Sequence, residues 1–159
     1  AGMDYGLEVS WLPSYGPEMR SGTSNCHVRL SHKPVDSPFV SRPNVLIALN
    51  EPSLRKFIAT VEPGGLVLYN GTELPADCRR ADLRSRAIPF FAVADELGST
   101  KVGNIVVLGA MLAETGALPL EVVDRALPRV VKAEKWIEID RQALRRGASL
   151  LNAEEPVHV

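Results

Sequence analysis

The residues of this chain with the clearest chemical potential lie in one polar stretch near the N-terminus. Residues 13–25 read PSYGPEMRSGTSN and separate two short apolar segments. Gly16, Pro17 and Gly22 allow tight backbone turns, and successive N–H groups in such turns can hold an anion. Arg20 adds a forked donor that suits a carboxylate or a phosphate. The stretch therefore has the composition of an anion-binding loop.

The remaining polar side chains of this loop could complete such a site, or they could satisfy one another. Glu18 can pair with Arg20 or cap a turn, which would leave no charge free for a ligand. From the residues alone, internal pairing is favoured over ligand binding. The candidate site residues are Tyr15, Gly16, Pro17, Glu18, Arg20, Gly22, Thr23 and Asn25.

Motifs for several other kinds of chemistry are missing from the sequence. It contains no G-x-G-x-x-G, G-x-x-x-x-G-K-[ST], H-E-x-x-H or G-x-S-x-G pattern. His27 and His32 would point to opposite faces of a strand, which argues against shared metal ligation and favours hydrogen-bonded or exposed imidazoles. Cys26 and Cys78 lack the spacing of a zinc or iron–sulfur site. The chain does not have the motifs of a complete enzyme.

Composition indicates a water-soluble globular protein. The chain has 159 residues, 45% hydrophobic content, 23% charged residues and a net charge of −1. We expect one domain over residues 1–159, with a flexible tail over 152–159. Four arginines between residues 79 and 86 alternate with acidic residues, so a mixed-sign solvated segment is favoured over a nucleic-acid site. No signal segment opens the chain, which favours the cytoplasm, reduced cysteines and no membrane contact.

Apolar runs predict the strands of an α/β fold. Short strands are expected at residues 7–11, 26–31, 44–50, 66–70 and 88–93. The run at 44–50 is almost purely apolar, which is typical of a strand buried on both faces of a parallel sheet. Glu51 and Pro52 then open a short helix, so that strand, helix and strand form a βαβ unit. We therefore predict a three-layer sandwich with a largely parallel, Rossmann-like sheet.

The longest helix is predicted over residues 101–116, and its apolar residues surround it on almost every side. It is too short to cross a membrane, which takes about 20 apolar residues. Small residues such as Gly109 allow another backbone to approach, and packing within the chain is favoured over a subunit contact. Further helices are expected at 118–132 and 140–146, the last ending at Gly147.

Several stretches together resemble one known family. They are WLPSYGPEMRSGTSNCHV, VDSPFV, PNVLIALNEPSL, EPGGLVLYN and ELGSTKVGNIVVLGAMLAETG, and they span most of the chain in order. This combination resembles the gamma subunit of 2-oxoacid:ferredoxin oxidoreductases. The form S-Y-G-P-E-M-R-x-G-T is more similar to the 2-oxoglutarate-type branch than to the pyruvate or indolepyruvate branches.

The resemblance implies a role within a larger enzyme. Such enzymes decarboxylate a 2-oxoacid, reduce ferredoxin and release an acyl-CoA, with coenzyme A as co-substrate. It implies that thiamine diphosphate, Mg and the iron–sulfur cluster are bound by partner alpha, beta or delta subunits, and none by this chain alone. The chain would be inactive by itself and able to form a homodimer in isolation.

The resemblance also implies a role for the polar loop, and two alternative functions of the chain remain open. It implies a subunit contact near the active-site mouth, where Arg20, Tyr15, Thr23 and Asn25 could touch substrate or coenzyme A. A purely structural assembly subunit and a nucleotide-binding module are the alternatives. The family's first strand and the glycine-rich G-x-G-G-Q-G turn after it have no counterpart here, and residues 1–6 would correspond to the end of the helix that follows the turn.

Overall fold

The structure is a computed structural model, and it describes residues 1–14 and 24–152. The chain forms two compact units, Gly2–Ile88 and Pro89–Val159, the latter with Ala1. All five described strands belong to the first unit, and the helices α2 to α5 belong to the second. A single domain over the whole chain stays a prediction. The predicted tail at 152–159 lies outside the described residues, apart from the last residue of α5.

A parallel three-stranded sheet forms the centre of the first unit. Its strands are β3 (Val45–Ala48), β4 (Leu66–Asn70) and β5 (Arg84–Ile88), in the order β3-β4-β5. The first three residues of β4, the central strand, are fully buried. The predicted α/β fold with a parallel sheet is confirmed.

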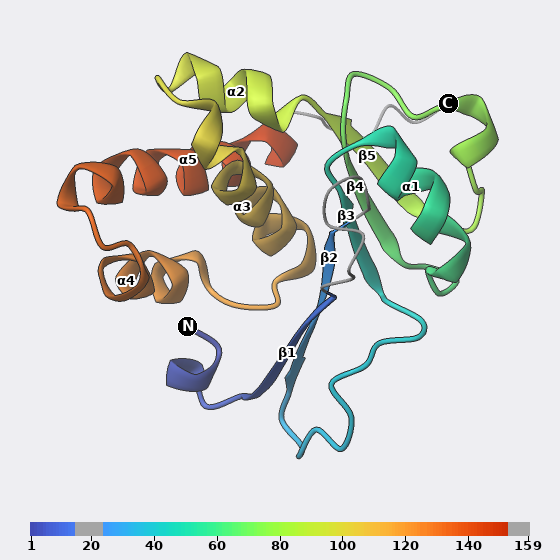
Figure 1. Ribbon diagram of the computed structural model, residues 1–159, viewed down its shortest axis with the longest axis horizontal. Coiled ribbons are helices and arrows are strands. Elements are labelled where there is room, and N and C mark those ends of the chain that lie inside the picture. The colour runs from blue at the N-terminus through green and yellow to red at the C-terminus, as the bar shows by residue number, and fades with distance from the viewer. Residues whose placement is uncertain (15–23, 153–159) are drawn as a thin grey trace. The chain divides into compact units, whose positions relative to one another are not determined.

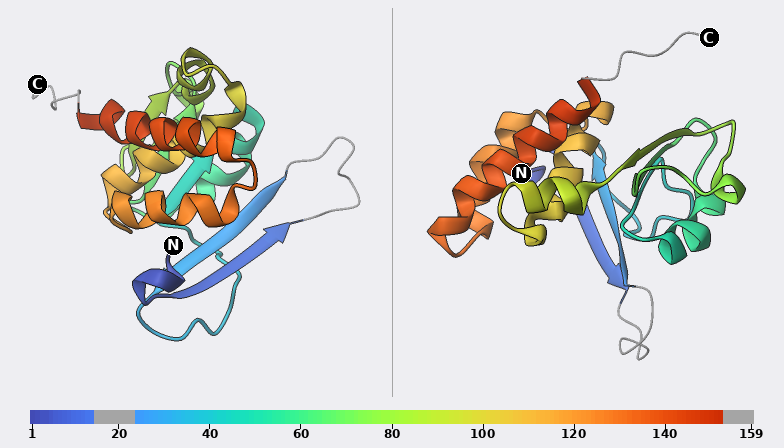
Figure 2. Two further views of the ribbon diagram at one scale, coloured as in Figure 1. Left: turned by 90° about the vertical axis from the view of Figure 1, so that its left-hand side faces the viewer. Right: turned by 90° about the horizontal axis from the view of Figure 1, so that it is seen from above.

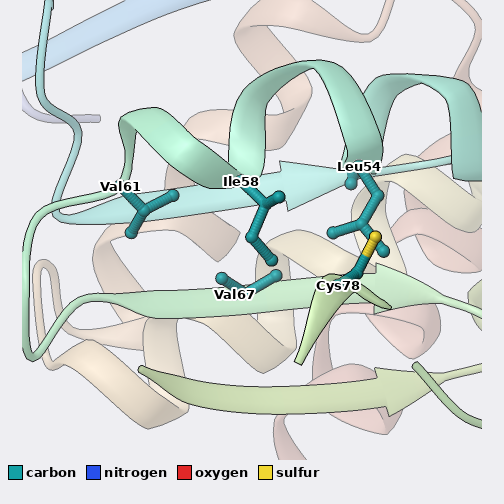
Figure 3. Close-up of a cluster of buried hydrophobic side chains, with 6 residues drawn as sticks. Leu54, Ile58, Val61, Val67 and Cys78 are labelled. Carbon is teal, nitrogen blue, oxygen red and sulfur yellow. The ribbon is translucent and has the colours of Figure 1, made fainter. Parts of the chain in front are cut away.

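The helix α1 (Glu51–Phe57), extended by the 3-10 turn η2 (Ile58–Thr60), packs on this sheet as expected. The Asn50 side chain caps it by accepting a hydrogen bond from the Ser53 N–H at 2.9 Å. Beneath it lies an apolar cluster (Figure 3) that also includes a residue of the 3-10 turn η3 (Ala76–Cys78). Its buried members are Ala48, Leu54, Ile58, Val61, Val67 and Cys78.

The prediction of a strand at residues 88–93 is wrong. The strand β5 ends at Ile88, and α2 (Phe90–Glu96) begins directly after Pro89. Proline at the N-cap lacks the N–H that a continuing strand would pair, and its φ suits a helix start. The apolar residues after it have a helical burial pattern, with Phe90, Val93 and Ala94 buried. The strand is β5 (Arg84–Ile88), which lies in the arginine-rich segment 79–86 and continues to Ile88. Its alternate residues Arg84 and Arg86 are exposed along the edge of the sheet.

The N-terminal strands form a separate antiparallel hairpin (Figure 2). The strands β1 (Glu8–Ser14) and β2 (Asn25–Ser31) pair over seven residues, from Glu8 opposite Ser31 to Ser14 opposite Asn25. Before them the 3-10 turn η1 (Met3–Tyr5) ends at Gly6, whose φ of 83° is in the left-handed region. The strand β1 continues three residues further than expected.

The second unit is built on a close crossing of two helices (Figure 1). The 3-10 turn η4 (Thr100–Val102) leads into α3 (Gly103–Thr115), followed by α4 (Leu120–Val130) and α5 (Glu134–Asn152). A Cβ on Gly109 of α3 would lie 2.0 Å from the Leu144 carbonyl oxygen, and one on Gly147 would lie 1.9 Å from that of Val106. Packing of the small residues within the chain's own core is confirmed.

The same crossing corrects two predictions about helix lengths. The longest helix is α5, not the helix at 101–116. Gly147 does not end a helix at 140–146 but lies inside α5, because its missing side chain is needed for contact with α3. The helix at 118–132 is confirmed as α4, with Pro128 inside it.

Substitution of Gly109 by Ala tests this crossing. In a helix without such a contact, alanine would stabilise the protein by about 1 kcal/mol. Here the added methyl group collides with backbone, so we expect the free energy of unfolding to fall by about 2 kcal/mol, as for overpacked cores. Urea unfolding measures the free energy of unfolding of Gly109→Ala. Ala113→Ser, which adds one atom at an exposed position of α3, is the control. A Gly109→Ala variant as stable as the parent would contradict the close crossing.

Candidate functional site

The predicted polar loop connects the two strands of the hairpin. Seven of its candidate residues lie outside the described residues: Tyr15, Gly16, Pro17, Glu18, Arg20, Gly22 and Thr23. Asn25 is described, half-buried, and lies opposite Ser14 where the ladder ends. The loop therefore begins and ends at neighbouring positions of the hairpin. It does not follow a strand of the parallel sheet, where open α/β sheets bind their ligands, and the site itself stays a prediction.

One face of the hairpin is held by the segment that follows it. The Val40 N–H donates a hydrogen bond to Nδ1 of His27 at 3.0 Å, and the Phe39 ring stacks on the imidazole at 5.0 Å. On the same strand, Arg29 donates to the Ser37 carbonyl oxygen at 2.7 Å. The hydrogen-bonded role predicted for His27 is confirmed, and the VDSPFV stretch has a local structural function.

The other face of the hairpin is apolar and open, a feature that the sequence interpretation missed. Trp11 lies directly opposite Val28, and both side chains are more than half exposed. The alternation of apolar residues in VSWLP and CHVRL was the available signal, because directly opposed residues share a face. The same alternation is typical of a strand with one covered face, so it does not by itself distinguish a covered face from an open one.

The arginine-rich segment is engaged in structural contacts. Arg80 pairs with Asp82 at 2.6 Å and donates to the carbonyl oxygens of Ile58 and Val61 at 2.8 and 3.0 Å. Arg79 donates to the Leu74 carbonyl oxygen at 3.2 Å. These contacts support the mixed-sign interpretation of this segment. Over residues 1–14 and 24–152, no group of three or more His, Cys, Asp or Glu side chains could hold a metal ion.

The cysteine thiols differ in environment. Cys26 is exposed on the hairpin, whereas Cys78 is buried beneath α1. Burial raises the pKa of the Cys78 thiol, which keeps it protonated and unreactive. Both thiols are free in the structure.

An ion-paired carboxylate joins α4 to α5. Asp124 accepts hydrogen bonds from Arg141 Nε at 2.7 Å and Arg145 Nη2 at 3.0 Å. Burial alone would raise the pKa of Asp124, but the two guanidinium groups outweigh it and lower the pKa below its ordinary value. The pair stabilises the helical unit only while the carboxylate is ionised. At Asp140 of α5, by contrast, burial raises the pKa of the carboxyl group.

Asp124→Asn should therefore change the pH dependence of stability. The pKa of Asp124 is lower in the folded protein than in the unfolded chain, where it is about 3.9. The ion pair therefore stabilises the folded protein at pH values above 3.9, and this stabilisation is lost as the pH falls through the folded-state pKa. We expect the variant to lose about 1 kcal/mol at pH 7 and to match the parent near pH 2. Thermal unfolding between pH 2 and pH 7 measures this, with Asp36→Asn as the exposed control. A constant difference across that range would exclude the ion pair as its cause.

Comparison with known proteins decides the family. The family model described as pyruvate ferredoxin/flavodoxin oxidoreductase matches residues 1–150. The chain belongs to this family. The crystal structure of a keto/oxoacid ferredoxin oxidoreductase gamma subunit from Geobacter sulfurreducens superposes with a TM-score of 0.79. It is 28% identical, and the match covers 96% of this chain and 85% of that one. The resemblance in sequence is thus confirmed in family and fold.

Curated relatives carry two different substrate names. Ketoisovalerate oxidoreductase subunit VorA of Methanothermobacter thermautotrophicus is 42% identical over 90% of this chain, which spans only 30% of that protein. The 2-oxoglutarate synthase subunit KorC of Methanocaldococcus jannaschii is 34% identical over 76% of this chain and 65% of its own length. The chain therefore spans less than a third of the first relative and about two thirds of the second. Within the described part of the chain, no helix is long and apolar enough to span a membrane.

Proposed function

We propose that this chain is the gamma component of a 2-oxoacid:ferredoxin oxidoreductase. The match of the family model to residues 1–150 carries this proposal, and the fold shared with a gamma subunit at 28% identity supports it. The reaction converts a 2-oxoacid and coenzyme A to an acyl-CoA and carbon dioxide, while two electrons pass to ferredoxin. The chain acts within the complex and is inactive alone.

The cofactors of this reaction belong to partner subunits under the same proposal. The whole sequence has two cysteines, whereas a ferredoxin-type cluster needs four ligands. One of the two is buried under α1 and the other lies on the hairpin, so they do not form a pair of ligands. Thiamine diphosphate with Mg, which supports decarboxylation, and the cluster, which carries electrons, are assigned to the alpha, beta or delta subunits.

The substrate is proposed to be 2-oxoglutarate, with ketoisovalerate as the competing 2-oxoacid. The relatives named for 2-oxoglutarate and those named for ketoisovalerate both match this chain well. The two acids differ at the end remote from the keto group, where 2-oxoglutarate has a second carboxylate and ketoisovalerate a branched alkyl group. A guanidinium such as that of Arg20 suits the first and not the second.

Purification of the complex tests the proposed function. The full-length chain, tagged and isolated from its host, should bring larger subunits that contain iron and thiamine diphosphate. We expect viologen reduction that requires both coenzyme A and a 2-oxoacid, with kcat/KM at least tenfold higher for 2-oxoglutarate than for ketoisovalerate. The reverse preference would overturn the substrate proposal alone. A chain recovered without such partners or activity would overturn the gamma-subunit proposal.

Arg20→Ala in the same complex tests the role of the polar loop. Loss of a charge-assisted hydrogen bond costs roughly 1.5–3 kcal/mol, so we expect KM to rise about 10- to 100-fold for the compound that Arg20 binds. A rise for 2-oxoglutarate alone indicates the distal carboxylate, and a rise for coenzyme A alone indicates a phosphate. Arg146→Ala, at an exposed position of α5, is the control. Unchanged KM values and normal assembly in Arg20→Ala would remove Arg20 from the site.

A further inference from the structure

A basic surface lies where α4 passes into α5, within the helical unit (Figure 1). Residues 125–136 carry four basic side chains and one acidic side chain, whereas the whole chain has a net charge of −1. Lys101 of η4, which is distant in the sequence, joins this segment through a contact with Trp136 of α5. The surface formed by Lys101, Lys132, Lys135 and Trp136 is here called the basic corner. Its three lysines are exposed and its tryptophan is half-buried.

The indole ring of Trp136 restrains two of these lysines. The Lys101 Nζ lies 6.0 Å from the ring centroid and the Lys135 Nζ lies 5.6 Å from it, both within the range of a cation–π contact. The two ammonium groups are therefore close neighbours, no further apart than these two distances together. Because their long side chains are already restrained, binding them costs less side-chain entropy than binding unrestrained lysines.

The positive charges of the basic corner are not neutralised by nearby carboxylates. None of its lysines forms a salt bridge within residues 1–14 and 24–152. By contrast, two arginines further along α5 both pair with Asp124. The three ammonium groups are thus available to carboxylates of another molecule.

The stability of the fold does not account for these lysines. Lys101 lies in the turn directly before α3, and Lys135 is the second residue of α5. The N-terminal end of a helix is the positive end of its dipole, where a cation is unfavourable and a carboxylate is favourable. Departures from local structural rules of this kind are expected at functional surfaces.

The composition of the basic corner indicates the chemistry of its partner. Unneutralised positive charge attracts a surface of opposite sign and increases the association rate. Val130, which ends α4 and is 70% exposed, adds an apolar side chain two residues before Lys132. Tryptophan and apolar side chains contribute to interfaces between proteins, whereas a phosphate backbone is bound mainly through charge. The net charge of −1 also opposes binding to nucleic acids and anionic membranes.

We propose that the basic corner is a docking surface for a protein partner that presents aspartate and glutamate side chains. The ammonium groups of Lys101 and Lys135 donate charge-assisted hydrogen bonds to these carboxylates. Val130 and the exposed part of Trp136 contact the apolar atoms around them. This inference does not depend on the proposed function, because it rests on the charges and contacts of the helical unit alone.

Charge reversal at Lys135 tests this surface in the full-length chain. Lys135→Glu places a carboxylate in the first turn of α5, so we expect its thermal unfolding temperature to equal that of the parent or to exceed it. Binding of fluorescein-labelled poly-L-glutamate, the acidic probe, should weaken at least tenfold, as measured by fluorescence anisotropy. Lys33→Glu makes the same change of charge at an exposed position of the first unit and should change binding less than twofold.

Carbodiimide coupling tests the contact in the assembly isolated from the host, because this reagent joins a lysine amine to a carboxylate that touches it. We expect Lys101 or Lys135 to be joined to an aspartate or glutamate of another polypeptide, with the link located by peptide mass spectrometry. The absence of such a link in an assembly that contains other polypeptides would overturn the proposal.

The probe experiment has three results that would also overturn the proposal. The first is a failure of the parent chain to bind poly-L-glutamate, or equal weakening by Lys33→Glu. The second is tighter binding of duplex DNA or phosphatidylserine vesicles than of poly-L-glutamate. The third is self-association of the parent chain that Lys135→Glu abolishes, since the partner would then be a second copy. Each of these results would leave the proposed function intact.

Discussion

The helical unit depends on the contact between two backbones where α3 meets α5. Glycine at positions 109 and 147 removes the side chains that would separate them, and each Cα faces a carbonyl oxygen of the other helix. Such an approach increases the dispersion contacts of the neighbouring buried residues, including Val106 and Leu144. The long α5 then provides the arginines that bind Asp124, so α4 is held to the same pair of helices.

The sequence predicted elements well where a single physical requirement determined the residue types. The run at 44–50 contains the predicted strand, β3, but the prediction that it is buried on both faces is wrong, because β3 lies at the edge of the sheet and Ile47 is 38% exposed. Asn50 caps the helix that follows, and Pro52 lies in its first turn. Other residues are of a type that suits two different structural roles, and the sequence alone does not show which role applies. Gly147 serves close packing, yet glycine is also the commonest helix stop. The run at 88–93 is apolar enough for either structure, and only the position of Pro89 separates strand from helix.

The candidate site could be predicted only in part for a related reason. Residue types in the polar loop suggested an anion-binding role, but the location of the loop depends on which strands pair. Strand pairing is a long-range property, and β1 pairs with β2 rather than joining the parallel sheet. The apolar face beside the loop follows from the pairing register, which places Trp11 against Val28. Family membership came from motifs along most of the chain and did not need this geometry.

The pairing register of the hairpin also determines where the length of related chains is free to change during evolution. One residue inserted within β1 would move Trp11 to the face now occupied by Ser10 and Leu12, because side chains alternate along a strand. Residues added between Ser14 and Asn25 would leave every cross-strand pair intact, at a loop-closure cost that grows only slowly with length. Where the hairpin of a homologous chain differs in length, the difference should therefore lie in this connection, while both strands keep a constant number of residues.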